Sequence, residues 1–403
     1  MIKIILDGAL FSETEMLGSS SHGMVRIAGE ILKEFTHYSE FDISFVNSIY
    51  SKQYDSMLKL FLEKNYPLYR DKILSDAPIL SSSLPGFRRS SKYLAKYLSL
   101  EVKTRGLEKG DIYHSFYYPF DNNVIRHVKI KKSITYLDII PLRMEGYPRA
   151  MVEITKQVVK SIASNFAISI SEFSKQDLLD YDNKISADRI FVAPLAASKE
   201  LFFQNTNREK SARVKRKYRL PDNYFLSISS NDIRKNVPHV IKCFSLFTLQ
   251  EKPKDLFLVI AGNAKYSSSI VDKLNIDKAV REKIIIIGRH IENEDMAVVY
   301  SNALCFFFMS LYEGFGLPVL EAMQCGVPVV TSDVSSLPEV VGNAAIMINP
   351  KDEIELCNTM NKVYNNESLR VKYSALGKVR ANDFSWQKCA NDYYEIFKRI
   401  ASY

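Results

Sequence analysis

The stretch that decides the fold runs from Met309 to Val330, and its sequence is MSLYEGFGLPVLEAMQCGVPVV. The apolar run 304–308 lies just before it and is too short to span a bilayer, so it predicts a buried parallel strand. Gly314 and Gly316 allow the backbone to approach a ligand closely. Pro318 suits the first turn of a helix, where a missing N–H costs nothing. The pattern therefore predicts a strand, a glycine-rich turn and a helix.

The residues after the turn predict a short helix followed by a second strand. The helix runs from Leu317 to about Gln324, Gly326 is its expected C-terminal cap, and 327–331 is a β-branched strand. A helix that begins at the carboxyl edge of a parallel sheet directs free N–H groups toward an anion. We therefore expect a phosphate at this turn.

Two carboxylates lie in this stretch, with seven residues between them. Glu313 stands where the first strand ends, and Glu321 lies one helical turn further in. A carboxylate can accept hydrogen bonds from both hydroxyls of a vicinal diol, so Glu321 suits a ribose, and Glu313 faces whatever the phosphate carries. The alternative is a surface loop with two solvated glutamates, but the glycines, the proline and the preceding strand argue against it.

This stretch resembles the EX7E motif of retaining glycosyltransferases of family GT4, which have the GT-B fold. The resemblance implies that Glu313 lies against the transferred sugar and that Glu321 holds the ribose of the nucleotide. It also implies that the turn gives backbone amides to the sugar and the diphosphate; the turn consists of Gly314, Phe315, Gly316, Leu317 and Pro318.

A second candidate site lies earlier in the same half of the chain. Arg234 and Lys235 follow a predicted strand, 224–228, and stand just before a predicted helix. There they can neutralise a diphosphate and stabilise it as a leaving group. The segment resembles the R-K-N segment of GT4 mannosyltransferases, and the alternative is a charged helix cap without a ligand. His290 and Ile291 follow another buried strand and resemble residues whose backbone meets the base.

The first half has the pattern of a parallel α/β domain, because apolar runs at 2–6, 43–46, 112–116, 133–137 and 166–170 alternate with helical stretches. The small-residue loop that ends at Arg26 resembles the G-x-x-R loop of many GT4 enzymes. By this resemblance Gly23 contacts the donor and Arg26 contacts the acceptor.

The segment 135–143, TYLDIIPLR, is similar to the H-D-L-I-P-L-R segment of the family, and Asp138 is carried over as a catalytic residue. Leu137 occupies the position of a histidine that commonly faces the donor sugar. Either the transferred sugar lacks the hydroxyl that histidine would hold, or another residue supplies the contact. His114 is the candidate, as an acceptor-side residue, and its alternative is a structural role at a strand end. In the following S-E-F-S segment, Ser171 or Ser174 is expected to cap a helix.

The composition limits the number of domains and the kinds of site that we expect. A chain of 403 residues with 46% hydrophobic content can form two domains with sizeable cores. The five cysteines form no C-x-x-C pair, so we expect neither a disulfide nor a zinc site.

No apolar run reaches ~18 residues and no signal peptide opens the chain, so we expect a cytoplasmic protein. Basic residues in 85–105 fit a helix on the inner face of the membrane; the alternative is a solvated surface helix.

We therefore predict two facing Rossmann-like α/β domains with a cleft between them: 1–204 for the acceptor, 205–383 for the nucleotide sugar, and a helix, 384–403, that returns to the first domain. The expected activity is retaining transfer of a hexose, mannose from GDP-mannose, to a saccharide or lipid-linked acceptor in surface polysaccharide assembly. We expect no metal, no cofactor and no nucleic acid as a partner. The alternatives are a UDP- or dTDP-sugar transferase and a nucleotide-sugar epimerase.

Overall fold

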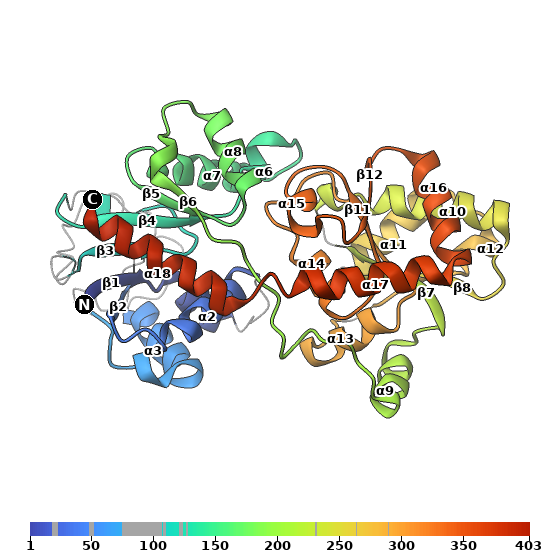
Figure 1. Ribbon diagram of the computed structural model, residues 1–403, viewed down its shortest axis with the longest axis horizontal. Coiled ribbons are helices and arrows are strands. Elements are labelled where there is room, and N and C mark those ends of the chain that lie inside the picture. Colours follow the sequence, from blue (N-terminus) through green and yellow to red (C-terminus); the bar gives the residue numbers. More distant parts are fainter. Residues whose placement is uncertain are drawn as a thin grey trace, which may run out of the picture. The chain divides into compact units, whose positions relative to one another are not determined.

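The computed structural model describes residues 1–17, 23–47, 52–74, 107, 110–120, 124–125, 128–229, 232–262, 264–288 and 290–403. The chain divides into two compact units. Unit 1 contains Met1–Ile170, Asp177–Ala193 and Gln387–Tyr403, and unit 2 contains Ser171–Gln176 and Pro194–Trp386. Figure 1 shows the helices and strands of both units, labelled where there is room.

Unit 1 is built on a parallel sheet of six strands in the order β2-β1-β3-β4-β5-β6. The strands are β1 (Ile2–Asp7), β2 (Phe41–Val46), β3 (Ile112–Ser115), β4 (Lys131–Tyr136), β5 (Phe166–Ser169) and β6 (Ile190–Val192). Every residue of β3 and β5 is buried, as expected for a parallel sheet that is covered on both faces. The helices that accompany the sheet are α1 (Ala9–Leu17), α2 (Gly23–Phe35), α3 (Lys52–Asn65), α6 (Ile140–Arg143), α7 (Arg149–Ile162), α8 (Glu172–Tyr181), whose first residues to Gln176 belong to unit 2, and α18 (Trp386–Ser402).

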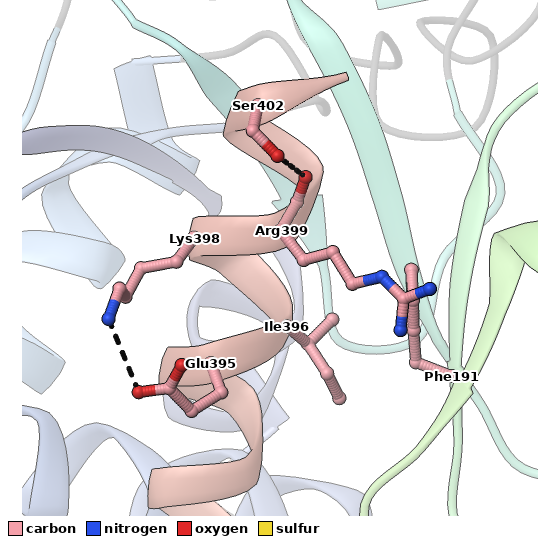
Figure 2. Close-up of a pocket in the computed structure, with 6 residues that line it drawn as sticks. All are labelled: Phe191, Glu395, Ile396, Lys398, Arg399 and Ser402. Atoms are coloured by element: carbon pink, nitrogen blue, oxygen red, sulfur yellow. Dashed lines mark hydrogen bonds and ion pairs between the residues drawn. The ribbon is translucent and has the colours of Figure 1, made fainter.

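Helix α18 returns the end of the chain to unit 1, where the Tyr393 hydroxyl lies 2.7 Å from Thr135 Oγ1. A hollow of about 430 Å³ lies along the C-terminal part of this helix. Figure 2 shows that Arg399 reaches across this hollow toward Phe191, with its guanidinium 5.0 Å from the ring centroid. The hollow contains none of the predicted site residues; its lining is Phe191, Glu395, Ile396, Lys398, Arg399 and Ser402.

Unit 2 is built on a second parallel sheet of six strands, in the order β12-β11-β10-β7-β8-β9. Its strands are β7 (Asn223–Ser229), β8 (Leu256–Gly262), β9 (Ile284–Ile286), β10 (Cys305–Phe308), β11 (Val329–Ser332) and β12 (Ile346–Ile348). Its helices are α9 (Arg208–Tyr218), α10 (Val237–Glu251), α11 (Ala264–Lys273), α12 (Lys278–Arg281), α13 (Asn293–Ser301), α14 (Leu317–Gln324), α15 (Leu337–Val341), α16 (Glu353–Asn365) and α17 (Glu367–Ala381). The predicted class of two α/β units, each with a parallel sheet, is confirmed.

The units divide at Ala193 and Pro194, earlier than the predicted domain boundary at 204. The residues between these positions pack on unit 2. The Phe202 carbonyl accepts a hydrogen bond from Gln324 Nε2 at 2.7 Å, and the Phe202 ring lies 6.2 Å from that of Tyr300. These contacts explain why the chain already belongs to unit 2 before residue 204.

The predicted basic helix, 85–105, lies outside the described residues, and so does most of the loop before Gly23. All five cysteines are described, and each is a free thiol. In the part of the chain that the structure describes, no helix combines the length and the hydrophobicity needed to cross a bilayer.

Candidate active site

The strand, turn and helix predicted around Glu313 are present in unit 2 as β10, the turn 313–316 and α14, and β11 follows. Gly316 is the residue before α14, and its φ of +115° favours glycine. A Cβ at this position would also lie 2.8 Å from Leu337 Cδ2. The backbone conformation therefore favours glycine here, and the close approach of a ligand to the turn stays a prediction.

Glu313 follows the end of β10, and its side chain is 7% exposed. Its Oε1 lies 2.6 Å from Lys235 Nζ, and its Oε2 forms an ion pair with Arg234 Nη1. Burial raises the pKa of the Glu313 carboxyl, but the positive charges of Lys235 and Arg234 outweigh burial and hold that pKa below its ordinary value. Glu313 is therefore ionised at neutral pH.

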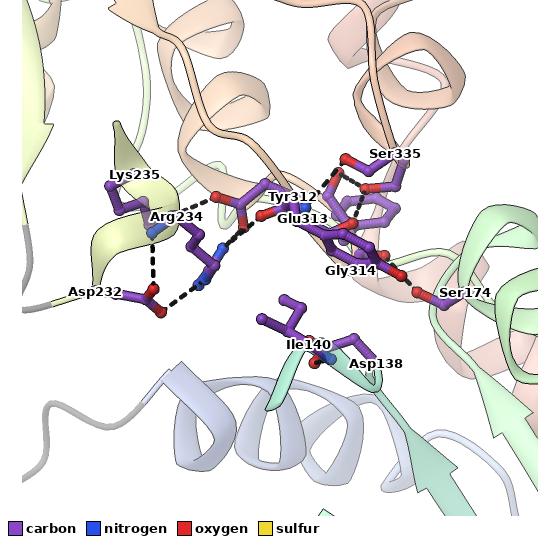
Figure 3. Close-up of polar contacts among 12 residues, drawn as sticks. Asp138, Ile140, Ser174, Asp232, Arg234, Lys235, Tyr312, Glu313, Gly314 and Ser335 are labelled. Atoms are coloured by element: carbon purple, nitrogen blue, oxygen red, sulfur yellow. Dashed lines mark hydrogen bonds and ion pairs between the residues drawn. The ribbon is translucent and has the colours of Figure 1, made fainter. Parts of the chain in front are cut away.

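Arg234 and Lys235 are placed by a short 3₁₀ turn, Ile233–Lys235, between β7 and α10. Because β7 and β10 are parallel neighbours, the segments that follow them emerge at the same edge of the sheet. Arg234 Nε donates to Asp232 Oδ2 at 2.7 Å, and Arg234 Nη1 donates to the Tyr312 carbonyl at 3.1 Å. Figure 3 shows both cations directed toward Glu313.

This arrangement places two cations and a buried carboxylate at the N-terminal end of α14. A diphosphate needs positive charge and free N–H groups, and a sugar attached to it needs a hydrogen-bond acceptor beside the bond that breaks. The structure thus brings Arg234, Lys235 and Glu313 together. Their roles in binding and catalysis stay predictions.

Glu321 lies inside α14, and it is 6% exposed. The Tyr300 hydroxyl of α13 donates to Glu321 Oε2 at 3.3 Å, and this partner was not predicted from the sequence. His290 and Ile291 follow β9, with His290 exposed and Ile291 buried. The predicted contacts of these residues with ribose and base stay predictions.

Four predicted site residues belong to unit 1: Asp138, Gly23, Arg26 and His114. Asp138 follows β4, and its Oδ1 accepts a hydrogen bond from the amide of Ile140, the first residue of α6, at 3.0 Å. Gly23 and Arg26 lie in the first turns of α2. Gly23 is exposed, and no atom lies within 4 Å of where its Cβ would be, so the described packing does not require glycine there.

His114 is fully buried in β3. Its Nδ1 lies 2.8 Å from Ser133 Oγ, and its Nε2 lies 3.0 Å from Thr135 Oγ1. Burial lowers the pKa of His114 to about 3, so the ring is neutral. Both ring nitrogens are used inside the sheet, which favours the structural alternative over a contact with an acceptor.

Four serines contact the turn after β10, and sequence reasoning missed these contacts. Ser335 Oγ accepts a hydrogen bond from the Glu313 amide at 3.0 Å, and Ser336 Oγ lies 2.9 Å from the Glu313 carbonyl. Ser171 Oγ accepts from the Ser174 amide at 3.0 Å, so the predicted N-cap is confirmed. The hydroxyls of Ser171 and Ser174 also donate to the Gly314 carbonyl, a contact that local sequence cannot indicate.

No three His, Cys, Asp or Glu side chains converge to hold a metal ion anywhere in the described ranges. Transfer without a metal therefore stays a prediction from the sequence, in which Arg234 and Lys235 supply the positive charge.

Comparisons with known proteins agree with this architecture. The family profile described as "Glycosyl transferases group 1" matches residues 208–380, which include the whole of the Arg234, Lys235 and Glu313 cluster. The O-antigen chain mannosyltransferase B of Escherichia coli is 29% identical over 351 residues, which is 85% of this chain and 91% of that protein.

Two solved structures share the fold. Sucrose-phosphate synthase from Thermosynechococcus elongatus has a TM-score of 0.69 at 15% identity, with 99% of each chain covered. HepE of Anabaena, in complex with UDP and glucose, has a TM-score of 0.68 at 14% identity, also with 99% of each chain covered. The matched profile and the relative similar over most of its length agree with this fold: residues 208–380 match the group 1 glycosyltransferase family, GT4, and the chain as a whole has the GT-B fold.

Proposed function

We propose that the protein transfers a hexose, namely mannose from GDP-mannose, to a saccharide or lipid-linked saccharide acceptor, with retention of configuration. The product would be a growing surface polysaccharide such as an O-antigen. The observation that best supports this proposal is the buried Glu313 carboxylate between Lys235 and Arg234, at the N-terminal end of α14.

The donor would bind along unit 2. Arg234 and Lys235, together with the N-terminal amides of α14, would hold the diphosphate. Glu321 would accept the hydroxyls of the ribose, and the backbone of His290 and Ile291 would meet the base. The sugar would then lie against Glu313.

The chemical step would break the bond between the anomeric carbon and the phosphate oxygen. The electron pair leaves with the diphosphate, whose new charge is offset by Arg234 and Lys235, and Glu313 offsets the positive charge that develops on the sugar. The acceptor hydroxyl attacks the face that the leaving group vacates, and its proton passes to the departing diphosphate oxygen. This sequence retains the anomeric configuration. Asp138 is carried over as a further catalytic residue.

Two kinds of observation support mannose. The relative with high coverage is named as an O-antigen chain mannosyltransferase, and the segments around Arg234 and Asp138 resemble those of mannosyltransferases. UDP- and dTDP-hexoses are the alternative donors, and HepE, which shares the fold, binds UDP and glucose. A nucleotide-sugar epimerase of the same fold is the second alternative. It would differ from a transferase in that it needs no acceptor and makes no glycoside.

A panel of nucleotide sugars tests the donor directly. A ligand that binds only the folded protein raises the midpoint of thermal unfolding according to its concentration relative to its dissociation constant. GDP-mannose should raise the midpoint more than UDP-glucose or dTDP-glucose at equal concentration. Larger shifts with UDP sugars would show that the donor is a UDP sugar and not GDP-mannose. If no nucleotide sugar shifted the midpoint, donor binding would be contradicted.

A further inference from the structure

We infer that Ser174 and Ser336, with Ser171, are positioning residues: they hold the turn 313–316 in the conformation in which its backbone N–H groups can meet the donor. The inference deepens the proposed function of this site and rests on it. The hydroxyls of these serines donate to backbone carbonyls of the turn, so they would act on the reaction through the turn.

Three successive carbonyls of the turn accept hydrogen bonds from these serines. Ser336 Oγ lies 2.9 Å from the Glu313 carbonyl and 2.8 Å from the Phe315 carbonyl, so it shares its one proton between them. The carbonyl of Gly314 accepts from Ser171 Oγ at 2.7 Å and from Ser174 Oγ at 3.0 Å. All three serines are at most 1% exposed, so water does not compete for these bonds.

The direction of the amides follows from the direction of the carbonyls. In a trans peptide the C=O and the following N–H point to opposite sides. Carbonyls directed at the serines therefore direct the amides of Gly314, Phe315 and Gly316 away from them. Within the described part of the chain, these three amides donate no hydrogen bond, and they are the groups that a phosphate or a sugar oxygen would accept from.

Two other groups fix the serines themselves. The Glu339 carboxylate of α15 accepts hydrogen bonds from the amides of Glu172 and Phe173, each at 3.0 Å, and so fixes the segment that carries Ser171 and Ser174. Arg380 Nη2 donates to the Glu339 carbonyl at 2.7 Å, which fixes α15. Ser336 is the residue before α15, so both sets of hydroxyls are held by one connected network.

Helix capping does not explain these hydroxyls. The hydroxyl of Ser336 caps no helix, and Ser174 lies inside α8, whose cap is Ser171. The turn contains Gly314 and Gly316, which have the widest conformational freedom of all residues, so its own sequence does not fix its peptide planes. Hydrogen bonds from residues outside the turn must therefore fix the orientation of its peptide planes.

The test compares the double variant Ser174→Ala/Ser336→Ala with the wild-type protein and with Ser374→Ala. Ser374 is a matched control, because its hydroxyl donates to the Gly326 carbonyl at 2.6 Å, just beyond the other end of α14. Hydrogen–deuterium exchange of a peptide that covers 313–317 reports the order of the turn without any ligand. Titration with GDP and UDP reports binding, and kcat and KM with the accepted donor report the reaction.

In the double variant we expect exchange at 313–317 to be faster by about 10-fold and kcat to fall by roughly 10- to 100-fold, as for a misplaced catalytic group. KM should change less than kcat, and Ser374→Ala should match the wild type in all three measurements. Unchanged exchange and kcat in the double variant would overturn the inference. A wild-type protein that binds no nucleoside diphosphate would instead overturn the proposed function, while the exchange measurement still decides whether the serines order the turn.

Discussion

The Nζ atom of Lys235 lies 2.6 Å from Oε1 of Glu313, although the two residues are 78 positions apart in the chain. The side chains are only 10% and 7% exposed, so the pair is held in a region where bulk water screens little. A buried carboxylate of this kind persists as an ion only because Lys235 and Arg234 compensate its charge. A diphosphate would compete with Glu313 for the same two cations.

Removal of both cations should slow transfer strongly. For Arg234→Ala/Lys235→Ala we expect kcat to fall by at least ~100-fold, because each cation acts on charge that develops as the diphosphate leaves. The same variant leaves Glu313 buried without compensation and should lose roughly 3–5 kcal/mol of stability. Steady-state kinetics and thermal unfolding measure the two effects.

Two further variants separate these effects. Adding Glu313→Gln to the double variant should restore much of the stability but none of the activity. Lys242→Ala removes an ion pair of the same length, 2.6 Å to Glu353, on an exposed face of α10, and it should change neither property much. A double variant with the kcat of the wild type at saturating donor would rule out the leaving-group role.

Glu321 should contribute to the affinity for the nucleotide only through its contact with the ribose hydroxyls. Glu321→Gln should weaken binding of the nucleoside diphosphate by roughly 1–3 kcal/mol, the range for a hydrogen bond to a charged group. The 2′,3′-dideoxy nucleotide has no diol, so the same substitution should leave its affinity nearly unchanged. Isothermal titration of both nucleotides against both proteins gives this comparison, and an equal loss for the two nucleotides would contradict the ribose assignment.

His114 should make the stability of the protein depend on pH. Its pKa is about 3 in the folded protein against an ordinary 6.5, so the unfolded chain binds a proton that the folded chain does not in this range. Stability is therefore complete above about pH 6.5 and should fall by about 1.4 kcal/mol per pH unit as the pH drops from there toward 3. His114→Gln, which cannot titrate, should lose this part of the slope, while substitution of the exposed His37 should keep it. Equal slopes in unfolding experiments at pH 7.5 and 5.5 for the wild type and the His114 variant would show that the histidine does not cause the dependence.

Gly316 should tolerate no side chain. Gly316→Ala places a Cβ at a φ of +115° and 2.8 Å from Leu337 Cδ2, so we expect a loss of roughly 1–3 kcal/mol in the free energy of unfolding. Gly288→Ala in the same unit meets no described atom within 4 Å and serves as the control. Differential scanning calorimetry measures both, and equal unfolding midpoints for the two variants would show that the turn adapts without strain.

The basic segment 85–105 leads to a prediction that rests on sequence alone. Arg88, Arg89, Lys92 and Lys96 could each add about 1 kcal/mol to binding at an anionic membrane surface. Co-sedimentation with anionic vesicles should then fall as salt rises, and it should fall again when these four residues are made neutral. Equal sedimentation with neutral and anionic vesicles would support the solvated surface helix instead.

Local sequence was sufficient to predict those helices, strands and turns that their own residues determine. The apolar run of β10, the β-branched run of β11 and the glycine and proline around the turn predicted the unit that carries Glu313 and Glu321. Arg234 and Lys235 were assigned to the diphosphate from their place after a strand, but their ion pairs with Glu313 were not predicted. That β7 and β10 are direct neighbours was not predictable, because strand order depends on contacts between distant segments.

Contacts over long sequence separations account for the rest. Ser171 was predicted as a helix cap, and it is one, but its second bond goes to Gly314, 143 residues later. His114 was a candidate for a ligand contact because Leu137 replaces the expected histidine and binding residues concentrate where strands turn into loops. Its partners, Ser133 and Thr135, lie on the neighbouring strand, and only the register of β3 and β4 reveals them.

The stereochemistry of the product tests the central claim most directly. The protein is incubated with GDP-α-mannose, or with whichever nucleotide sugar protects it best from unfolding, and with saccharide acceptors, and the glycoside is examined by NMR. We predict a glycoside with the anomeric configuration of its donor, α-linked from GDP-α-mannose, formed together with one equivalent of free nucleoside diphosphate. A glycoside of inverted configuration, or a converted nucleotide sugar without any glycoside, would contradict retaining transfer at Glu313.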